Sequence, residues 1–406
     1  RHNQRRILQS LRWHGPMSRT ELSAATGLSA STVTAITAAF LESATLAEMA
    51  PPDNMASRRG RPQVTLALNP ATASAGALSL SLNRISAAAV DYAGNVVSEV
   101  VKRVPTRDAD ARTLADAMVT TLREAFSTSA TPLGPLRHIA MGVQGVTDSA
   151  GTTMLWSPIT RHTDLRLGEM LGEAFGVPAM LANDCNMIAK ALKRRDPDRF
   201  GASFAAVLLS HGIGMGLFVN GEQVGGIESS ATEFGHMVHD QGGALCRCGR
   251  RGCVEAYAGD YAIWRAASGH DAQEQPVDDL ESRKMLELVG RARSEDGAER
   301  RAYHTAGLAI GSALRSMFAL FDPFPVAFVG TGAAAFDLLE PSIRESIGRS
   351  AIGMATSDIE MYTFSDEFPL VRDGAAFSAL ASIDDLSFAP AGMPANHAQR
   401  SLGRAS

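Results

Sequence analysis

The sequence is poor in cysteine, in net charge and in long apolar runs, and each shortage excludes a class of protein. Four cysteines in 406 residues cannot form a disulfide framework. The nearest approach to a membrane span, Phe200–Gly221, lacks formal charge but holds five glycines and a Ser210-His211 break, so we expect two buried strands around a turn. Because the polar, basic start, Arg1–Leu11, also lacks the apolar centre of a signal peptide, we expect a cytoplasmic protein that contacts no membrane.

The sequence has enough apolar residues for a core and an uneven distribution of charge. Hydrophobic residues make up 45% of the chain and charged residues 20%, and the length allows two or three domains. The net charge is −5, yet residues 1–65 hold eight arginines against four acids. A basic N-terminal segment ahead of an acidic body indicates a nucleic-acid partner for the first segment alone.

Three short helices are predicted at the N-terminus. Apolar spacing favours a helix over Asn3–Trp13, and Ser18 with Glu21 forms a capping box for a second. The Gly27-Leu28 turn and a third helix over Ala30–Leu41 complete the helix-turn-helix pattern. The third helix is expected to bury Val33, Ile36 and Phe40 and to present outward Ser31, Thr32, Thr34 and Thr37.

A basic hairpin is predicted directly after the third helix. Ala44–Met49 and Val64–Leu68 favour paired strands, and Ser57–Pro62 between them reads Ser-Arg-Arg-Gly-Arg-Pro. A flat Arg-Gly-Arg tip suits a narrow minor groove, so we interpret the hairpin as a wing. The alternatives are a disordered basic loop and a plain surface helix rich in serine and threonine. The residues expected to contact DNA are Arg19, Ser29, Ser31, Thr32, Thr34, Arg58, Arg59, Gly60 and Arg61.

Strands and helices alternate through the rest of the chain, which favours an α/β layer architecture. Gly76–Val90 is interpreted as one strand paired with Val96–Val104, and helices are expected over Asn186–Arg194, over Glu255–Ala267 and from Ala375. The expected division is a winged helix-turn-helix domain over 1–68, a first α/β subdomain over 75–183 plus about 372–388, a second over 184–371 and a flexible tail over 389–406.

Three of the four cysteines lie in one short, glycine-containing segment. The spacing of Cys246, Cys248 and Cys253 is typical of a tetrahedral zinc site, because three soft thiolates can reach one ion. His236, ten residues before Cys246, is the best candidate for the fourth ligand. Four protein ligands leave no position for water, so we predict a structural zinc, about one per chain. The alternative is three reduced cysteines without a metal.

The same region carries a motif that identifies a family. Glu233-Phe-Gly-His236, followed by Cys246-x-Cys248-Gly-x-x-Gly-Cys253-x-Glu255, resembles the ROK family of sugar kinases and sugar-responsive repressors. The resemblance covers roughly 75–385 and implies a two-domain actin-like/hexokinase-like (ribonuclease H-like) α/β fold with sugar in the cleft between the domains. With its N-terminal winged helix-turn-helix, the chain is similar to the repressor branch, which contains xylose and N-acetylglucosamine repressors.

The resemblance also implies a sugar site. Asn183 and Asp184 match the family's sugar-binding pair, in which the aspartate is the general base of the kinases, and Glu233, His236 and Glu255 match further sugar contacts. Carboxylates and amides suit this role because they offer acceptors and donors to adjacent hydroxyls. For Asp184, an N-terminal cap of the following helix is an equal alternative, and the two roles are compatible.

The phosphate loops of the family's kinases are not retained. The positions that match their Asp-x-Gly-Gly-Thr loop read Ser79-Leu-Ser-Leu-Asn83, and their Gly-Thr-Gly-Ile-Gly loop is replaced by Ser210-His-Gly-Ile-Gly214. Leu82 stands where phosphate oxygens would approach the backbone, so no functional ATP site is expected.

The resemblance therefore implies a repressor of carbohydrate-utilisation genes, with operator DNA and a sugar as partners, acting as a homodimer or homotetramer. Two alternatives are a sugar kinase with a fused DNA-binding domain and a regulator that answers to a protein partner.

Overall fold

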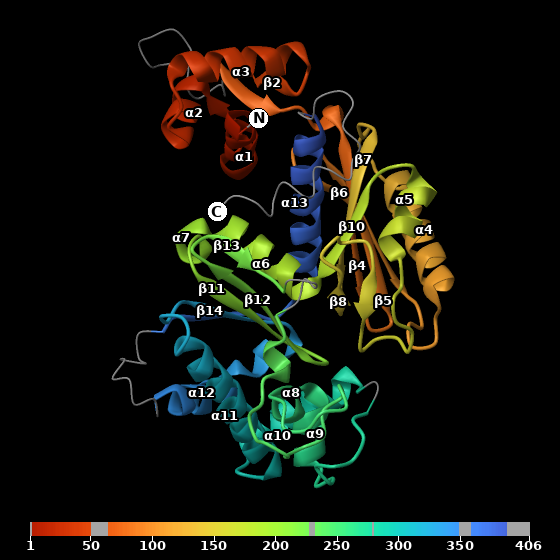
Figure 1. Cartoon of the computed structure of the whole chain (residues 1–406), viewed down its shortest axis with the longest axis vertical. Coiled ribbons are helices and arrows are strands. Elements are labelled where there is room, and N and C mark those ends of the chain that lie inside the picture. The colour runs from red at the N-terminus through yellow and green to blue at the C-terminus, as the bar shows by residue number, and fades with distance from the viewer. Residues whose placement is uncertain (1, 50–63, 227–231, 278–279, 349–358, 388–406) are drawn as a thin grey trace.

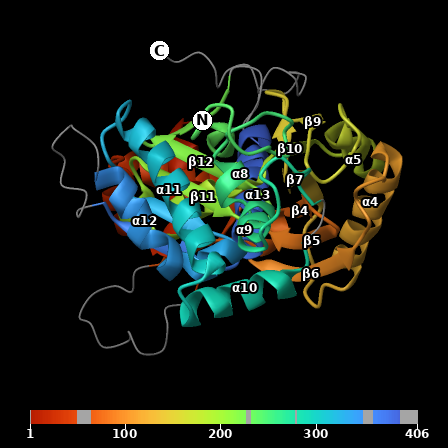
Figure 2. The ribbon, with the colours of Figure 1, turned by 90° about the horizontal axis from the view of Figure 1, so that it is seen from below.

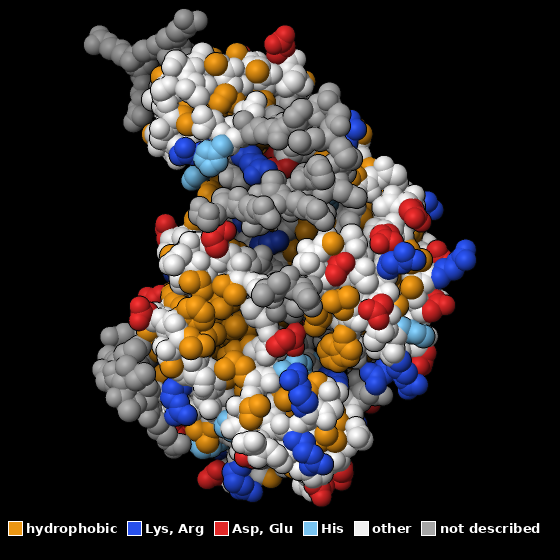
Figure 3. Space-filling model, viewed as in Figure 1, with side chains coloured by type: hydrophobic (Ala, Val, Ile, Leu, Met, Phe, Trp, Pro, Cys, Tyr) orange, Lys and Arg blue, Asp and Glu red, His pale blue; other side chains and the backbone are white. Residues whose placement is uncertain are grey.

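The computed structural model describes residues 2–49, 64–226, 232–277, 280–348 and 359–387. Figure 1 shows a small helical module at one end of the molecule and two larger sheets below it, and Figure 3 shows acidic and basic side chains interspersed over this face of the body. Two helices, α6 (Asp184–Arg195) and α13 (Phe368–Ser387), lie between those sheets.

The N-terminal module is a helix-turn-helix with a small sheet. Its helices are α1 (His2–His14), α2 (Arg19–Thr26) and α3 (Ala30–Glu42), and its antiparallel strands, in spatial order, are β1 (Met17–Ser18), β3 (Thr65–Leu68) and β2 (Leu46–Met49). The expected capping box of Ser18 and Glu21 is confirmed, and Gly27 ends α2 with a φ of 62°. The chain bends by 119° between α2 and α3, which is typical of a helix-turn-helix.

One residue of α3 was assigned to the wrong face. Thr37 is fully buried, where its hydroxyl donates to the Val33 carbonyl at 2.8 Å and accepts from Arg19 Nε at 3.0 Å. Thr37 lies one turn after the buried Val33 and therefore shares its face. The expectation that Thr37 points outward is thus wrong.

The first large sheet has five strands in the order β10-β7-β4-β5-β6. Their bounds are β4 (Ser74–Ser81), β5 (Arg84–Asp91), β6 (Val96–Arg103), β7 (Leu136–Val143) and β10 (Ala179–Asn183). β4, β7 and β10 run parallel, whereas β4, β5 and β6 form an antiparallel meander. The single strand expected over Gly76–Val90 is therefore wrong, because Asn83, with a φ of 53°, turns the chain between β4 and β5.

The second large sheet repeats this topology in the order β13-β12-β11-β14-β15. Its strands are β11 (Phe204–Leu209), β12 (Ile213–Val219), β13 (Glu222–Val224), β14 (Val326–Val329) and β15 (Met361–Phe364). β11, β14 and β15 run parallel, and β11, β12 and β13 are antiparallel. The β11–β12 pair confirms the two buried strands expected around the turn at Ser210-His211.

Helices cover both sheets (Figures 1 and 2). α4 (Ala111–Ser127) and α5 (Leu167–Phe175) pack on the first sheet, and α11 (Ala298–Phe318) and α12 (Phe336–Gly348) lie beside the second. The smaller elements are β8 (Val146–Thr147), β9 (Met154–Trp156), α7 (Pro197–Phe200), α8 (Glu255–Ala258), α9 (Asp260–Ala267), α10 (Ser282–Ser294) and the 3-10 turns η2 (Pro70–Thr72), η3 (Phe234–His236) and η4 (Thr331–Ala335).

Three helix expectations need correction. The helix expected over Glu255–Ala267 is two helices, α8 and α9, since the chain leaves helical geometry at Gly259. α6 begins at Asp184, two residues before the expected start, and α13 begins at Phe368, seven residues before Ala375.

The N-terminal module is held to the body by a buried ionic contact. Arg12 of α1 donates to Asp384 of α13 (Nη1–Oδ2, 2.6 Å), and the Tyr92 hydroxyl donates to the same carboxylate at 2.7 Å. Burial alone would lower the pKa of Arg12, but the Asp384 carboxylate outweighs burial and raises it. Arg194 of α6 donates to the Arg12 carbonyl at 2.7 Å. α6 and α13 therefore both end on α1.

Within the described ranges, no single helix combines the length and apolarity of a membrane span. The bent pair α2 and α3 passes that test together, by length and composition only.

Candidate functional site

A small cavity of about 80 Å³ lies between the two large sheets. Its lining brings together residues from the ends of β10 and β11, from η3 and from α8. Among them are all five residues expected to contact sugar: Asn183, Asp184, Glu233, His236 and Glu255.

Asn183 and Asp184 stand where β10 passes into α6. Asn183 is the N-cap: its Oδ1 accepts from the Cys185 amide at 2.9 Å, and its Nδ2 donates to the Gly145 carbonyl at 2.9 Å. Asn183 is thus the N-cap residue, and Asp184 shares its contact, since Asp184 Oδ1 accepts from the same Cys185 amide at 2.9 Å. Burial raises the pKa of Asp184 to about 7, so this carboxyl can either accept or donate a hydrogen bond near neutral pH.

Glu255 is anchored at the start of α8 with 6% of its surface exposed. Its Oε2 accepts from the Ile213 amide at 3.2 Å, and its Oε1 accepts from the Tyr261 hydroxyl at 3.4 Å. Gly212 permits this approach, because a Cβ there would lie 2.7 Å from Glu255 Oε2. Gly212 thus serves packing against a carboxylate, although its position matches a phosphate loop.

His236 connects the cavity to the cysteine segment. Its Nδ1 lies 3.7 Å from Cys246 Sγ, and its Nε2 lies 3.6 Å from Glu233 Oε2. The two ring nitrogens therefore face different partners. A metal bound at Nδ1 would fix the ring and, with it, the direction in which Nε2 faces the cavity.

Four donor atoms converge beside His236. The side chains of His236, Cys246, Cys248 and Cys253 place one donor each within 4.8 Å of one another. Cys248 Sγ and Cys253 Sγ are 3.8 Å apart, which matches the edge of a tetrahedron with zinc–sulfur bonds of about 2.3 Å. Three thiols and one imidazole are a donor set that suits zinc. The cluster can therefore hold a zinc ion.

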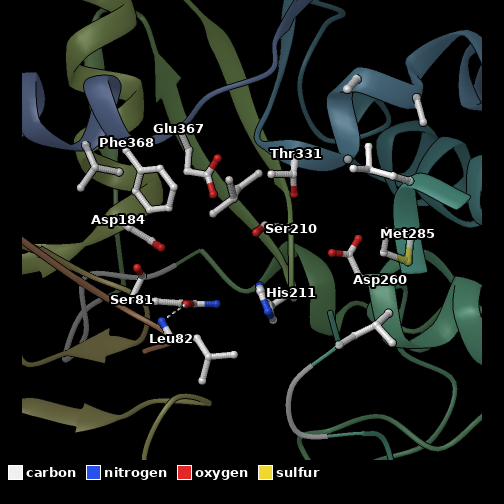
Figure 4. Close-up of a pocket in the computed structure, with 18 of the residues that line it drawn as sticks. Ser81, Leu82, Asp184, Ser210, His211, Asp260, Met285, Thr331, Glu367 and Phe368 are labelled. Atoms are coloured by element: carbon white, nitrogen blue, oxygen red, sulfur yellow. Dashed lines mark hydrogen bonds between the residues drawn. The ribbon is translucent and has the colours of Figure 1, made fainter. Parts of the chain in front are cut away.

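The amides that match the first phosphate loop are already bonded within the chain. Leu82 N donates to Gln144 Oε1 at 3.2 Å, the dashed line in Figure 4, and Asn83 N donates to Thr106 Oγ1 at 3.2 Å. In the second loop, a Cβ at Gly214 would lie 2.4 Å from Cys185 Sγ, so this glycine also serves packing. Sequence reasoning singled out Leu82 but missed the role of Gln144 as its partner.

The residues expected to contact DNA differ in exposure and in whether their side chains are already hydrogen-bonded within the chain. Ser31 and Thr34 are exposed on α3, and the exposed Ser29 caps that helix by accepting from the Thr32 amide at 3.2 Å. Arg19 is held by its bond to Thr37 and lies 3.9 Å from Glu48 Oε1. The wing residues Arg58, Arg59, Gly60 and Arg61 lie outside the described residues.

Comparison with known proteins accounts for both parts of the chain. The ROK family signature matches residues 76–367. The chain belongs to the ROK family. A winged helix-turn-helix DNA-binding signature matches residues 1–43, so this ROK protein carries a DNA-binding module ahead of its ROK body.

Several curated relatives of this ROK chain are repressors. It is 22% identical to the xylose repressor of Bacillus subtilis, over 88% of this chain and 90% of that one. It is 27% identical to the DNA-binding transcriptional repressor Mlc of Escherichia coli, over 83% of both chains. Identity to the dual regulator NagC of the same species is 23%, over 84% of this chain and 82% of NagC.

Solved structures give the same fold. A ROK family transcriptional regulator, a homologue of the E. coli Mlc protein, superposes with a TM-score of 0.75 at 24% identity and covers 93% of this chain and 95% of its own. A ROK glucokinase from Streptomyces griseus, solved with glucose and AMPPNP, gives a TM-score of 0.61 at 22% identity, over 75% of this chain and 99% of its own. The fold class expected from the sequence is confirmed.

Proposed function

We propose that this ROK chain is a sugar-responsive transcriptional repressor that binds operator DNA through its winged helix-turn-helix. The observation that carries the proposal is the convergence of Asn183, Asp184, Glu233, His236 and Glu255 on one cavity. A site built from such groups selects hydroxylated ligands, because a ligand without hydroxyls leaves buried polar atoms unpaired. Its repressor relatives favour the same role.

The proposal also covers the zinc ion, the compartment, the oligomeric state and the domain division. The His236 and cysteine cluster holds about one structural zinc per chain and keeps His236 oriented toward the sugar. The repressor works in the cytoplasm as a homodimer or homotetramer, since a two-fold arrangement suits paired operator half-sites. For the described residues we propose the domain division expected from the sequence, with the sugar cavity between the two α/β subdomains; the tail expected over 389–406 lies outside the described residues.

The phosphate-loop amides argue against a kinase. Phosphoryl transfer depends on positioned donors around the phosphates, and the amides of Leu82 and Asn83 are occupied by side chains of the same chain. One observation favours the kinase alternative: Asp184 is retained with a pKa near 7, which suits a general base. A direct test must therefore measure binding and turnover together.

Titration with monosaccharides, amino sugars and their phosphates is expected to find a ligand of micromolar to millimolar Kd, roughly −8 to −4 kcal/mol, with no sugar-dependent ATP consumption. Asp184→Ala should weaken the effect of that ligand on operator binding at least tenfold and leave unliganded DNA affinity unchanged, because Asp184 acts through the ligand. Asp116→Ala, an exposed acid on α4, is the matched control. Turnover of ATP that Asp184→Ala abolishes would establish the kinase instead.

The wing supplies a second prediction. Replacing Arg59 and Arg61 by alanine is expected to weaken operator binding and to reduce the slope of log affinity against log salt by up to about two, since each phosphate contact contributes roughly 0.9. Arg283→Ala with Arg301→Ala removes the same charge from exposed positions of the body and should change neither quantity. Equal behaviour of the two double variants would refute the wing assignment.

A further inference from the structure

A second cavity, of about 370 Å³, lies beside the sugar cavity and shares Gln144, Asp184 and Leu208 with it. It is lined by the two segments that match the phosphate loops of the family's kinases, Ser79–Leu82 and Ser210-His211, which lie on different sides of it (Figure 4). The volume is in the range of sites for small organic ligands. We call it the inner chamber.

One part of the inner chamber is apolar. α10, which runs along the lower edge of the molecule in Figure 2, contributes three side chains to the wall, and Leu82 lies across from it. Leu286 is 70% exposed, so this part of the wall faces solvent as well as the chamber. The apolar wall residues are Leu82, Leu280, Met285, Leu286 and Val289.

The opposite part is acidic. Asp184 at the start of α6, Asp260 at the start of α9 and Glu367 just before α13 direct their carboxyls into the chamber (Figure 4). Glu367 is only 8% exposed, and its Oε2 has no hydrogen-bond partner among the described residues. A buried carboxylate oxygen without a donor is costly, so a ligand that donates there gains free energy.

The bases near these carboxyls do not neutralise them. Burial raises the pKa of Asp260 to about 7, against the opposing effect of Arg247, and the Glu367 carboxylate raises it further. Burial also raises the pKa of Glu367, and its own backbone amide, nearby Arg84 and the Ser210 hydroxyl only partly offset this. Arg293, which lines the chamber, is already paired with Asp337 at 2.7 Å. Near neutral pH the two aspartyl carboxyls are therefore partly protonated, and a bound cation would stabilise the ionised forms of all three acids, whereas a phosphate would not.

We infer that the inner chamber is a second ligand site, distinct from the sugar cavity, that takes an organic cation with an apolar body. The ammonium group donates to Glu367 Oε2 and to Asp260, and the apolar body packs against α10 and Leu82. Because Asp184 lines both cavities, the cation and the sugar affect each other's binding.

Calorimetric titration of the full chain with three phenylalkyl compounds, a cation, a neutral alcohol and an anion, tests this assignment. Phenethylamine is expected to bind at least tenfold more tightly than 2-phenylethanol, and phenylpropionate should not bind. Asp260→Asn with Glu367→Gln keeps the shape of the chamber while removing two charges, and it should reduce the preference for the amine over the alcohol to less than twofold. Asp116→Asn with Glu173→Gln, exposed acids on α4 and α5, should preserve the preference.

A second variant tests whether the amine occupies the chamber, independently of the charge on the acids. Met285→Trp fills the apolar wall without touching the acids and should abolish amine binding, while sugar binding at the smaller cavity persists. The inference is overturned if phenethylamine does not bind, if the alcohol binds equally well, or if amine binding survives both variants. Sugar binding is measured in parallel, so failure of this site is distinguishable from failure of the proposed function.

Discussion

Asp384→Ala is expected to release the winged helix-turn-helix from the body and to uncouple operator binding from sugar. The side chains of Arg12 and Asp384 are 4% and 3% exposed, so the variant leaves a guanidinium buried beside Tyr92 without its carboxylate. Breaking a buried pair in this way costs about 3–5 kcal/mol. The response that costs the least free energy is for α1 to separate from α13, which returns the Arg12 guanidinium to water. Operator titrations with and without sugar, together with thermal unfolding, measure both effects.

Two controls isolate the buried pair. Arg195→Ala removes an ion pair between α6 and α13 whose arginine side chain is 43% exposed, and an exposed pair is worth only about 0–1 kcal/mol. Arg12→Met with Asp384→Leu replaces both charges by apolar groups and should recover most of the lost stability. An Asp384→Ala protein with unchanged melting and an intact sugar response would contradict the role given to this contact.

Cys253→Ser is expected to lose the zinc ion, to lower the melting temperature and to weaken sugar binding at least tenfold, about 1.4 kcal/mol. Cys253 is 1% exposed and supplies one of the four donors, so the variant leaves an incomplete tetrahedron. Structural zinc contributes folding free energy directly. Sugar binding suffers with it because His236 is no longer held with Nε2 toward the cavity. Elemental analysis and calorimetry measure the two losses.

The fourth cysteine provides the control. Cys185 is equally buried but lies in α6, outside the donor cluster, so Cys185→Ser should retain about one zinc per chain. Full zinc content in Cys253→Ser, or unchanged sugar affinity in protein stripped of zinc by a chelator, would show that the cluster does not orient the sugar site.

The sequence predicted elements well where a local signal marks their ends. The Ser18 capping box placed α2, and the charge-free stretch around Ser210 predicted the β11–β12 hairpin. The sequence prediction failed where adjacent buried strands share one apolar pattern, because little then marks where one strand ends and the next begins. β4 and β5 are both buried, so their apolar run looked like one strand, and only the backbone at Asn83 shows the turn.

In the candidate site, too, a cluster of residues close together in sequence was predicted, and a pair of acids far apart in sequence was not. The cysteine spacing predicted a cluster that the structure brings within 4.8 Å, since those ligands lie close in sequence. Asp260 and Glu367, in contrast, are single acids 107 residues apart, and no pattern links them. Only the packing of α9 and of the segment just before α13 around one cavity joins them, and this depends on tertiary structure.

The length of α13, one of the two helices between the sheets, determines how far its end moves when the helix tilts. At 1.5 Å per residue, the 16 residue steps of α13 from Phe368, which lines the inner chamber, to Asp384, which holds α1, span about 24 Å. A tilt of α13 by about 5° at Phe368 therefore moves Asp384 by roughly 2 Å. Since the buried pair fixes that end to α1, the DNA-reading helix moves as part of a lever. In a dimer, two such levers would change the half-site separation by several ångströms, enough to spoil the fit to grooves spaced about 34 Å apart.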